Sequence, residues 1–235
     1  MPKTLYLLLI GFALLVSCND KLQTVAAQSA KPLPNYDTLK ANIRQQQAAI
    51  RAAYLQADTI MRDSLVTVTQ QYLLHIITTD LFQQWYNTPW DFNGITNTPG
   101  KGKVACGYFV TSVLADAGFN IPRLAWAQLA SETMIKKLNP AVKKFSNKTI
   151  EEFEVYVKSK PDGLYIVGLD CHVGFVSKVK GKLLFTHSSY YQPDIGVMSE
   201  ELQGHNPLND SKYRVLGPML HREMVVNWIM GNKYQ

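Results

Sequence analysis

Residues 163–188 read GLYIVGLDCHVGFVSKVKGKLLFTHS. Three runs rich in aliphatic, aromatic and β-branched residues lie at 163–169, 172–179 and 182–188, and short polar breaks separate them. The dipeptide Lys180-Gly181 between the last two runs is typical of a two-residue hairpin turn. We therefore expect consecutive strands here, with the last two paired antiparallel.

The hairpin turn also predicts which side chains meet. With 180–181 as the two turn residues, Gly174 lies opposite His187. Side chains alternate with a period of two, so His172 shares a face with Gly174. His172 and His187 are then diagonal neighbours, about 7–8 Å apart at the backbone and within reach of each other. By the same alternation Cys171 points to the opposite face, where we expect a packed thiol.

Helical patterns dominate the rest of the chain. Runs of good helix formers, or apolar residues at i, i+3 and i+4, predict helices at about 36–60, 63–86, 106–117, 124–138, 149–158 and 221–230. Thr149 and Glu152 form a capping-box pattern. A Gly- and Pro-rich loop is expected at 88–103, and a further strand at 213–220. Helices followed by an antiparallel sheet indicate the α+β class.

The first residues resemble an export signal. Met1-Pro2-Lys3 is a short basic start, and 5–16 is an uncharged, mostly apolar run. That run is too short to cross a ~30 Å hydrocarbon core as a helix, which takes about 20 residues, and it fits a secretory signal peptide. Leu15-Val16-Ser17-Cys18 resembles a bacterial lipobox, which implies cleavage before Cys18 and lipidation of its thiol. A plain signal peptide with a chance cysteine is the alternative.

We therefore expect an exported protein, anchored by lipid to the periplasmic or cell-surface side of a bacterial membrane. Its expected parts are a signal peptide at 1–17, a flexible tether at 18–35, a helical arm at 36–62, and a single domain at 63–235. An apolar stripe along the arm, which includes Ile43, Leu55 and Ile60, favours packing on the domain over a free spacer.

Composition narrows the function classes. The 235 residues are 46% hydrophobic and 18% charged, which excludes a disordered chain. The net charge of +6 is a mild basic bias without a dense basic run, so we expect no nucleic-acid partner. The sequence has no phosphate loop, dinucleotide fingerprint or zinc-ligand spacing, and we expect no cofactor or metal. A monomer is expected.

Cys106 is the candidate nucleophile. It lies at the start of a predicted helix, where free N–H groups and the helix dipole are expected to lower the pKa of the thiol. A nucleophilic cysteine also needs a base, and His172 can take its proton while His187 orients the His172 ring. Because exported proteins can hold disulfides, a Cys106–Cys171 bridge is the alternative for both thiols.

Several short blocks resemble the NlpC/p-sixty family of cell-wall cysteine peptidases. The sequence TPWDFNG at 88–94, followed by CGYFV at 106–110, is similar to the family's T-P-Y-x-W-G-G and D-C-S-G-F-V segments. HVGFV at 172–176 and LFTHSS at 184–189 resemble its H-V-G-I-Y and F-I-H-A-S strands. The resemblance covers about 63–220 and is strong in these blocks alone.

The resemblance implies a papain-like α+β fold and a catalytic triad of Cys106, His172 and His187. The implied reaction is amide hydrolysis in peptidoglycan stem peptides, often next to a D-glutamyl residue. Trp90, which replaces a family tyrosine thought to bind substrate or the oxyanion, and Ser188 are the candidate substrate contacts.

The chain also departs from the family's pattern. Compared with a minimal member of the family, it has an insertion at about 119–162, between the cysteine helix and the sheet. Ala105 replaces the aspartate before the cysteine, and Gly107 replaces the serine after it. Two alternatives to a peptidase therefore stay open. One is a related thiol amidase of the CHAP type or an acyltransferase, in which an amine can resolve the acyl-enzyme in place of water. The other is a catalytically degenerate lipoprotein that binds wall peptides through the same cleft.

Overall fold

The computed structural model describes residues 33–235, which begin with two long helices, α1 (Tyr36–Gln56) and α2 (Thr59–His75). The side chain of Asn35 caps α1 and that of Asp58 caps α2, so each start follows from a favoured capping residue. The predicted signal peptide, the lipidation site Cys18 and most of the predicted tether lie outside the described residues. No helix among the described residues is long and apolar enough to cross a membrane.

The remaining helices follow the predicted order, except for α8, which the sequence analysis did not predict. They are η1 (Ile76–Leu81, a π-helical turn), α3 (Phe82–Trp85), α4 (Cys106–Asp116), α5 (Arg123–Ala127), α6 (Ser131–Leu138), α7 (Ile150–Lys158), α8 (Pro207–Asp210) and α9 (Arg222–Met230). The single helix expected at 124–138 is two helices, because the chain breaks between Ala127 and Ser131. The capping box of Thr149 and Glu152 is present at the start of α7.

The strands form one antiparallel sheet, which confirms the α+β class. They are β1 (Lys143–Ser146), β2 (Gly163–Leu169), β3 (Val173–Val179), β4 (Lys182–Ser188), β5 (Val197–Glu200) and β6 (Tyr213–Pro218), in the order β1-β6-β2-β3-β4-β5. Strands β2 and β4 have the predicted bounds, and β3 begins one residue later than expected. The sequence analysis did not predict β1 or β5.

The β3–β4 register confirms the hairpin arithmetic. Val179 pairs with Lys182 and Phe175 with Thr186. Lys180 and Gly181 have φ values of +51° and +76°, as both central residues of a type I′ turn require. The carboxylate of Asp162 accepts hydrogen bonds from both of their backbone N–H groups.

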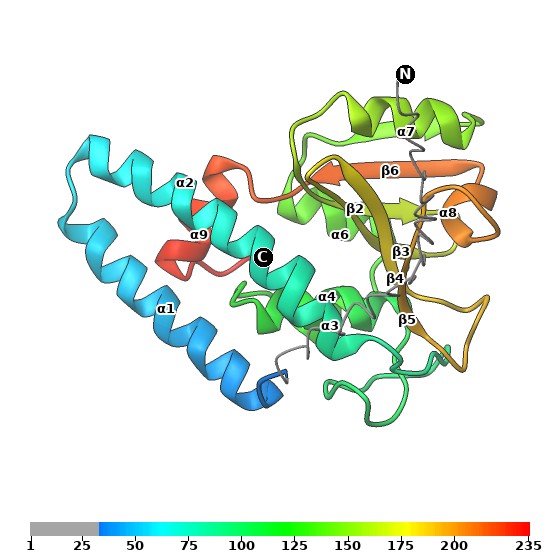
Figure 1. Ribbon diagram of the computed structural model, residues 1–235, viewed down its shortest axis with the longest axis horizontal. Coiled ribbons are helices and arrows are strands. Elements are labelled where there is room, and N and C mark those ends of the chain that lie inside the picture. Colours follow the sequence, from blue (N-terminus) through cyan, green and yellow to red (C-terminus); the bar gives the residue numbers. More distant parts are fainter. Residues whose placement is uncertain (1–32) are drawn as a thin grey trace, which may run out of the picture. The chain divides into compact units, whose positions relative to one another are not determined.

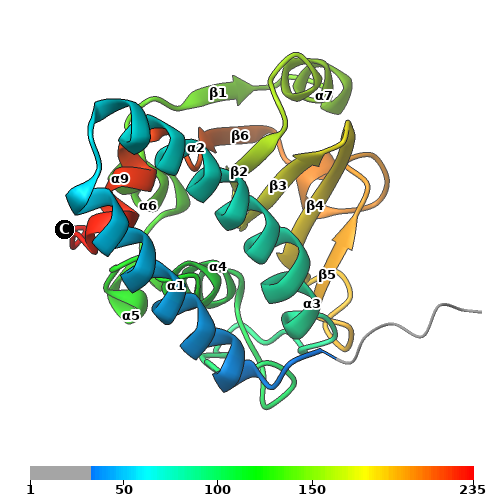
Figure 2. The same cartoon turned by 60° about the vertical axis from the view of Figure 1, so that its left-hand side comes forward.

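Two apolar cores pack on the sheet. The larger core joins the sheet to α1, α2, α4, α6 and α9, and the smaller one joins it to α7 and α8. In Figure 2, α1 and α2 run side by side across the helical layer, in front of α4 and α9. The sheet lies between this layer and α7 (Figure 1).

The N-terminal arm belongs to the same compact unit as the rest of residues 33–235. Ile43 is 1% exposed, and the Tyr36 hydroxyl donates to a carboxylate oxygen of Asp116 at 2.6 Å. Leu55 and Ile60, at the end of the expected stripe, are exposed. The boundary expected between 62 and 63 falls inside α2.

Candidate active site

Cys106 is the first residue of α4, as predicted. Ala105 is the N-cap and supplies no side-chain hydrogen bond, so the first N–H groups of this helix are left without a side-chain cap. Backbone N–H groups of Val173 and Gly107 approach the thiol and lower its pKa. Burial has the larger effect, and the net pKa of Cys106 is raised. The expected lowering of this pKa is therefore wrong, because Cys106 is half-buried and its thiol is partly removed from water.

The loop before α4 is folded back against the start of that helix. The backbone N–H of Ala105 donates to the carbonyl of Gly94 at 2.8 Å, and that of Val104 donates to Pro89 at 2.9 Å. A side chain at Gly94 would lie 2.6 Å from the backbone of Lys103, so this close approach requires glycine. The folded loop brings Trp90 to the same cleft as Cys106.

Gly107 lets α5 approach the start of α4. A Cβ atom at this position would lie 2.3 Å from the carbonyl oxygen of Ala127. Ala127 is the last residue of α5, and it lines the cleft together with the next two residues, Gln128 and Leu129. The first part of the predicted insertion thus forms one wall of the site.

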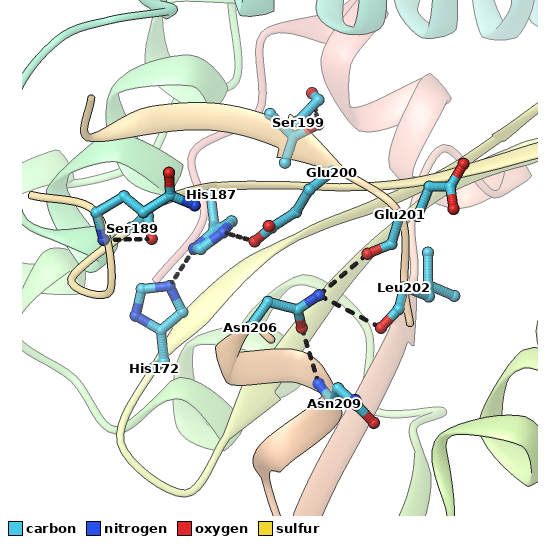
Figure 3. A network of polar contacts seen from close by, with 11 residues as sticks. His172, His187, Ser189, Ser199, Glu200, Glu201, Leu202, Asn206 and Asn209 are labelled. Carbon is cyan, nitrogen blue, oxygen red and sulfur yellow. Dashed lines mark hydrogen bonds and ion pairs between the residues drawn. The ribbon is translucent and has the colours of Figure 1, made fainter. Parts of the chain in front are cut away.

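Three side chains on or next to neighbouring strands form a hydrogen-bonded row (Figure 3). Nε2 of His172 lies 2.8 Å from Nδ1 of His187, as expected from the register. Nε2 of His187 lies 2.7 Å from Oε1 of Glu200. Nδ1 of His172 is buried and has no hydrogen-bond partner among the described residues.

The sheet positions this row. His172 immediately precedes β3, His187 is on β4 and Glu200 ends β5, where it pairs with Phe185. Gly174 lies against His187, and a side chain there would come within 2.8 Å of the His187 Cβ atom. The missing side chain makes room for the side chains of His187 and Phe185.

Burial controls the charges in the row. It lowers the pKa of His172 well below its ordinary value, and the neighbouring His187 lowers it further. Burial lowers the pKa of His187 to about 3 and raises that of Glu200. At neutral pH both imidazoles are therefore uncharged and the thiol is protonated.

The cleft around Cys106 has two lobes. Both are lined by Cys106, Cys171 and His172. One lobe, of about 480 Å³, adds Ser131, Glu132, Asp170 and Tyr213. The aromatic lobe, of about 560 Å³, adds Trp90, Phe92, Ile95, Tyr108 and Tyr190. The Cys106 thiol therefore lies between the two lobes. A substrate chain that enters one lobe would meet open space in the other.

Cys171 is not the packed thiol that strand alternation predicts. It is exposed, and its sulfur lies 3.8 Å from the hydroxyl of Tyr190. The prediction is wrong because β3 begins at Val173, and a turn closed by a hydrogen bond from Leu169 to the carbonyl of His172 precedes it. Cys106 and Cys171 are both free thiols in this structure, not a disulfide.

The two candidate substrate contacts lie in different places. Trp90 lines the aromatic lobe, and its indole Nε1 is buried without a hydrogen-bond partner among the described residues. Ser188 is fully buried and donates to the carbonyl of Val104 at 2.7 Å. That hydroxyl ties β4 to the segment before α4, so we do not retain Ser188 as a substrate contact.

Glu200 is the one member of the row that sequence reasoning missed. Its strand is four residues long, and the preceding turn-rich segment hides it. The available signal was the run V-M-S-E after Gly196, in which Met198 and Glu200 would share one face of a strand. Nothing in that run indicates which strand it joins.

Residues 33–235 contain no group of three or more His, Cys, Asp or Glu side chains that could hold a metal ion. Comparison of the chain with known protein families, with curated proteins and with solved structures gave no match.

Proposed function

We propose that this protein is a cysteine-dependent amide hydrolase that acts on peptides, with a papain-like arrangement of its nucleophile and base. One observation carries the proposal. Cys106 lines a cleft together with His172, and one nitrogen of that histidine is held by His187 while the other has no partner among the described residues. A thiol, a base and an orienting group are the parts that covalent acyl transfer requires.

The steps follow from the charges. The resting thiol and imidazole are both neutral, so His172 takes the thiol proton as the sulfur attacks the substrate carbonyl carbon. The first N–H groups of α4 and the indole N–H of Trp90 are candidate donors to the oxyanion. The C–N bond then breaks, and the leaving amine receives the proton from His172. Water attacks the thioester, and the acid product leaves with Cys106 restored as a thiol.

The cleft favours a substrate that extends on both sides of the bond. One lobe is aromatic and the other carries Glu132 and Asp170, so a peptide with an apolar or flat portion and a polar portion fits it. Peptidoglycan stem peptides are the class that the motif resemblance implies. We propose them as substrates of an enzyme anchored to a bacterial membrane through Cys18, which needs no cofactor.

The first test uses an activated ester, which requires no knowledge of the natural substrate. The full chain is mixed with p-nitrophenyl acetate, and acetylation is mapped by peptide mass spectrometry. We expect a burst of p-nitrophenolate with the acetyl group on Cys106. Cys106→Ala and His172→Ala should lose the burst, whereas Cys171→Ala, which removes the other thiol of the cleft, should keep it. An unchanged burst in Cys106→Ala, or loss of the burst in Cys171→Ala, would overturn the proposal.

The second test addresses the substrate class. Stem peptides are incubated with the wild-type chain and with Cys106→Ala, and the masses of the products are measured by mass spectrometry. Hydrolysis should add one water across one amide bond in the wild-type sample alone. Acylation by the ester without cleavage of any stem peptide would keep the thiol chemistry and exclude this substrate.

The raised pKa of Cys106 favours a second candidate function. A thiol and imidazole that are both neutral also suit a binding module that retains the cleft without the reaction. Tight binding of intact stem peptides by both the wild-type chain and Cys106→Ala, without acetylation by the ester, would identify it.

A further inference from the structure

We propose that Glu200 is a positioning residue that sets the proton positions on both histidines, so that Nδ1 of His172 is left as the proton acceptor for Cys106. This inference rests on the proposed function for its role in catalysis. The hydrogen-bond geometry of the row does not depend on the proposed function, and neither does the measurement of the tautomers.

The contacts define a directed row. Glu200 reaches one nitrogen of His187, and the other nitrogen of the same ring reaches His172. Figure 3 shows Glu200 pointing towards His187, while the neighbouring Glu201 points away. The His187 side chain is fully buried and that of Glu200 is 19% exposed, so water has little access to compete for the hydrogen bond between them.

Further packing holds His187 in place. The ring stacks on Phe185 with centroids 4.1 Å apart, and it lies edge-on to His172 at 5.0 Å. These contacts restrict rotation of the imidazole. The two ring nitrogens of His187 therefore keep their separate partners.

The tautomers follow from hydrogen-bond capacity. With Glu200 ionised, its carboxylate can only accept, so Nε2 of His187 must then carry the proton. A neutral imidazole has one N–H, so Nδ1 of His187 is then an acceptor, and Nε2 of His172 must donate to it. The single proton of His172 is thereby placed on Nε2, and its Nδ1 is left with a free lone pair.

Without Glu200, the direction of hydrogen-bond donation along the row can reverse. His187 could carry its proton on Nδ1 and donate to His172, which would then hold its own proton on Nδ1. That nitrogen could no longer accept a proton from the thiol. The carboxylate thus acts on the reaction through two rings and touches neither substrate nor sulfur.

The test measures tautomers and reactivity in the same variants. The full chain is labelled with ¹⁵N-histidine, and two-bond ¹H–¹⁵N spectra report which ring nitrogen of each histidine carries hydrogen. His172→Asn and His187→Asn assign the two signals. Glu200→Leu removes the acceptor, Glu200→Gln keeps an acceptor oxygen without the charge, and Glu201→Leu is the matched control one residue along.

We expect both histidines of the wild-type chain to carry hydrogen on Nε2. Glu200→Leu should move hydrogen to Nδ1 in both rings and slow acetylation of Cys106 by roughly 10²-fold, the lower end of what a general base contributes. Glu200→Gln should restore the tautomers and part of the rate, and Glu201→Leu should match the wild type in both.

Two results would overturn the inference. One is a wild-type spectrum with hydrogen on Nδ1 of His172 or His187, which needs no variant to fold. The other is a folded Glu200→Leu protein with wild-type tautomers and rate. If the wild-type chain is not acetylated at all, the proposed function fails, and the spectra still decide whether Glu200 orders the row.

Discussion

At Cys106, burial and the backbone shift the pKa of the thiol in opposite directions. The N–H groups of Val173 and Gly107 stabilise the thiolate, but removal of the thiol from water destabilises it more. A simple alkylating agent reacts with the thiolate. We therefore expect the rate of alkylation of Cys106 by iodoacetamide to rise with pH, with a midpoint above that of an ordinary thiol.

The measurement follows the Cys106 peptide by mass spectrometry in a Cys171→Ala chain, across a pH series. The same chain in denaturant supplies the reference midpoint, because unfolding removes the burial. A folded midpoint at or below the denatured one would show that the helix N-terminus outweighs burial.

Gly174 is a second position where a single added atom would disturb the site. An added Cβ would lie 2.7 Å from the Phe185 ring and 2.8 Å from the His187 Cβ atom. Gly174→Ala should displace His187, lower stability by about 1–3 kcal/mol as overpacking does, and lengthen the contact between the two histidines. Thermal unfolding and the histidine spectra report both effects.

Gly163→Ala is the matched control for this change. It is also a strand glycine, but its nearest neighbour would lie 3.9 Å from the new Cβ. It should leave both the stability and the histidine signals close to those of the wild type. Equal losses in the two variants would mean that the space beside His187 is not what Gly174 provides.

Within the hydrogen-bonded row, the sequence predicted the contact between His172 and His187 but not the third residue, Glu200. His172 and His187 could be placed because the two-residue turn at 180–181 fixes the register of a single hairpin. Glu200 enters through a different strand, whose register no turn rule determines. The pKa of Cys106 was mispredicted because burial depends on elements distant in sequence, which a helix N-terminus alone does not reveal.

Among the elements, α4 and α5 meet at the nucleophile, and serine at two neighbouring positions should have opposite effects. Gly107→Ser would press a Cβ against the carbonyl oxygen of Ala127 and cost about 1–3 kcal/mol. Ala105→Ser would supply the missing N-cap oxygen of α4 and add about 1 kcal/mol.

Denaturant unfolding of both variants measures the difference. Ala105→Ser adds a hydroxyl at an uncapped helix start, whereas Gly107→Ser adds a side chain where the backbone of Ala127 already lies. The sign of the change in unfolding free energy therefore distinguishes capping from crowding. A Gly107→Ser protein as stable as the wild type would mean that α5 can move away from α4 without loss.

The two strands that the sequence analysis did not predict are both short, and most of their residues are not buried. Strands β1 and β5 are edge strands of four residues, and each buries a single residue, Phe145 or Val197. Period-two alternation needs more than one buried position to be visible. The long strands β2, β3 and β4 are buried over most of their length, and their apolar runs identified them.

For the molecule as a whole, the N-terminal arm is part of the fold that supports the site. The Gln47 amide donates to the carbonyl of Trp228 at 2.6 Å, and Leu39 and Ile43 are buried in the larger core. The expected stripe was right near the middle of α1 and wrong at the tip, where Leu55 and Ile60 are exposed. Periodicity shows that a helix has an apolar face but not how far its partner extends.

Two isoleucines of this arm test its role in the fold with the same chemical change. Ile43→Ala removes a side chain that is 1% exposed and should cost about 2–5 kcal/mol. Ile60→Ala removes one that is 82% exposed and should stay within about 0.5 kcal/mol of the wild type. Denaturant unfolding should give a single transition for the described unit, because α1 shares the core that holds α4 and β3. Equal stabilities for the two variants, or a separate early transition in Ile43→Ala, would instead make the arm a spacer whose loss leaves the Cys106 site intact.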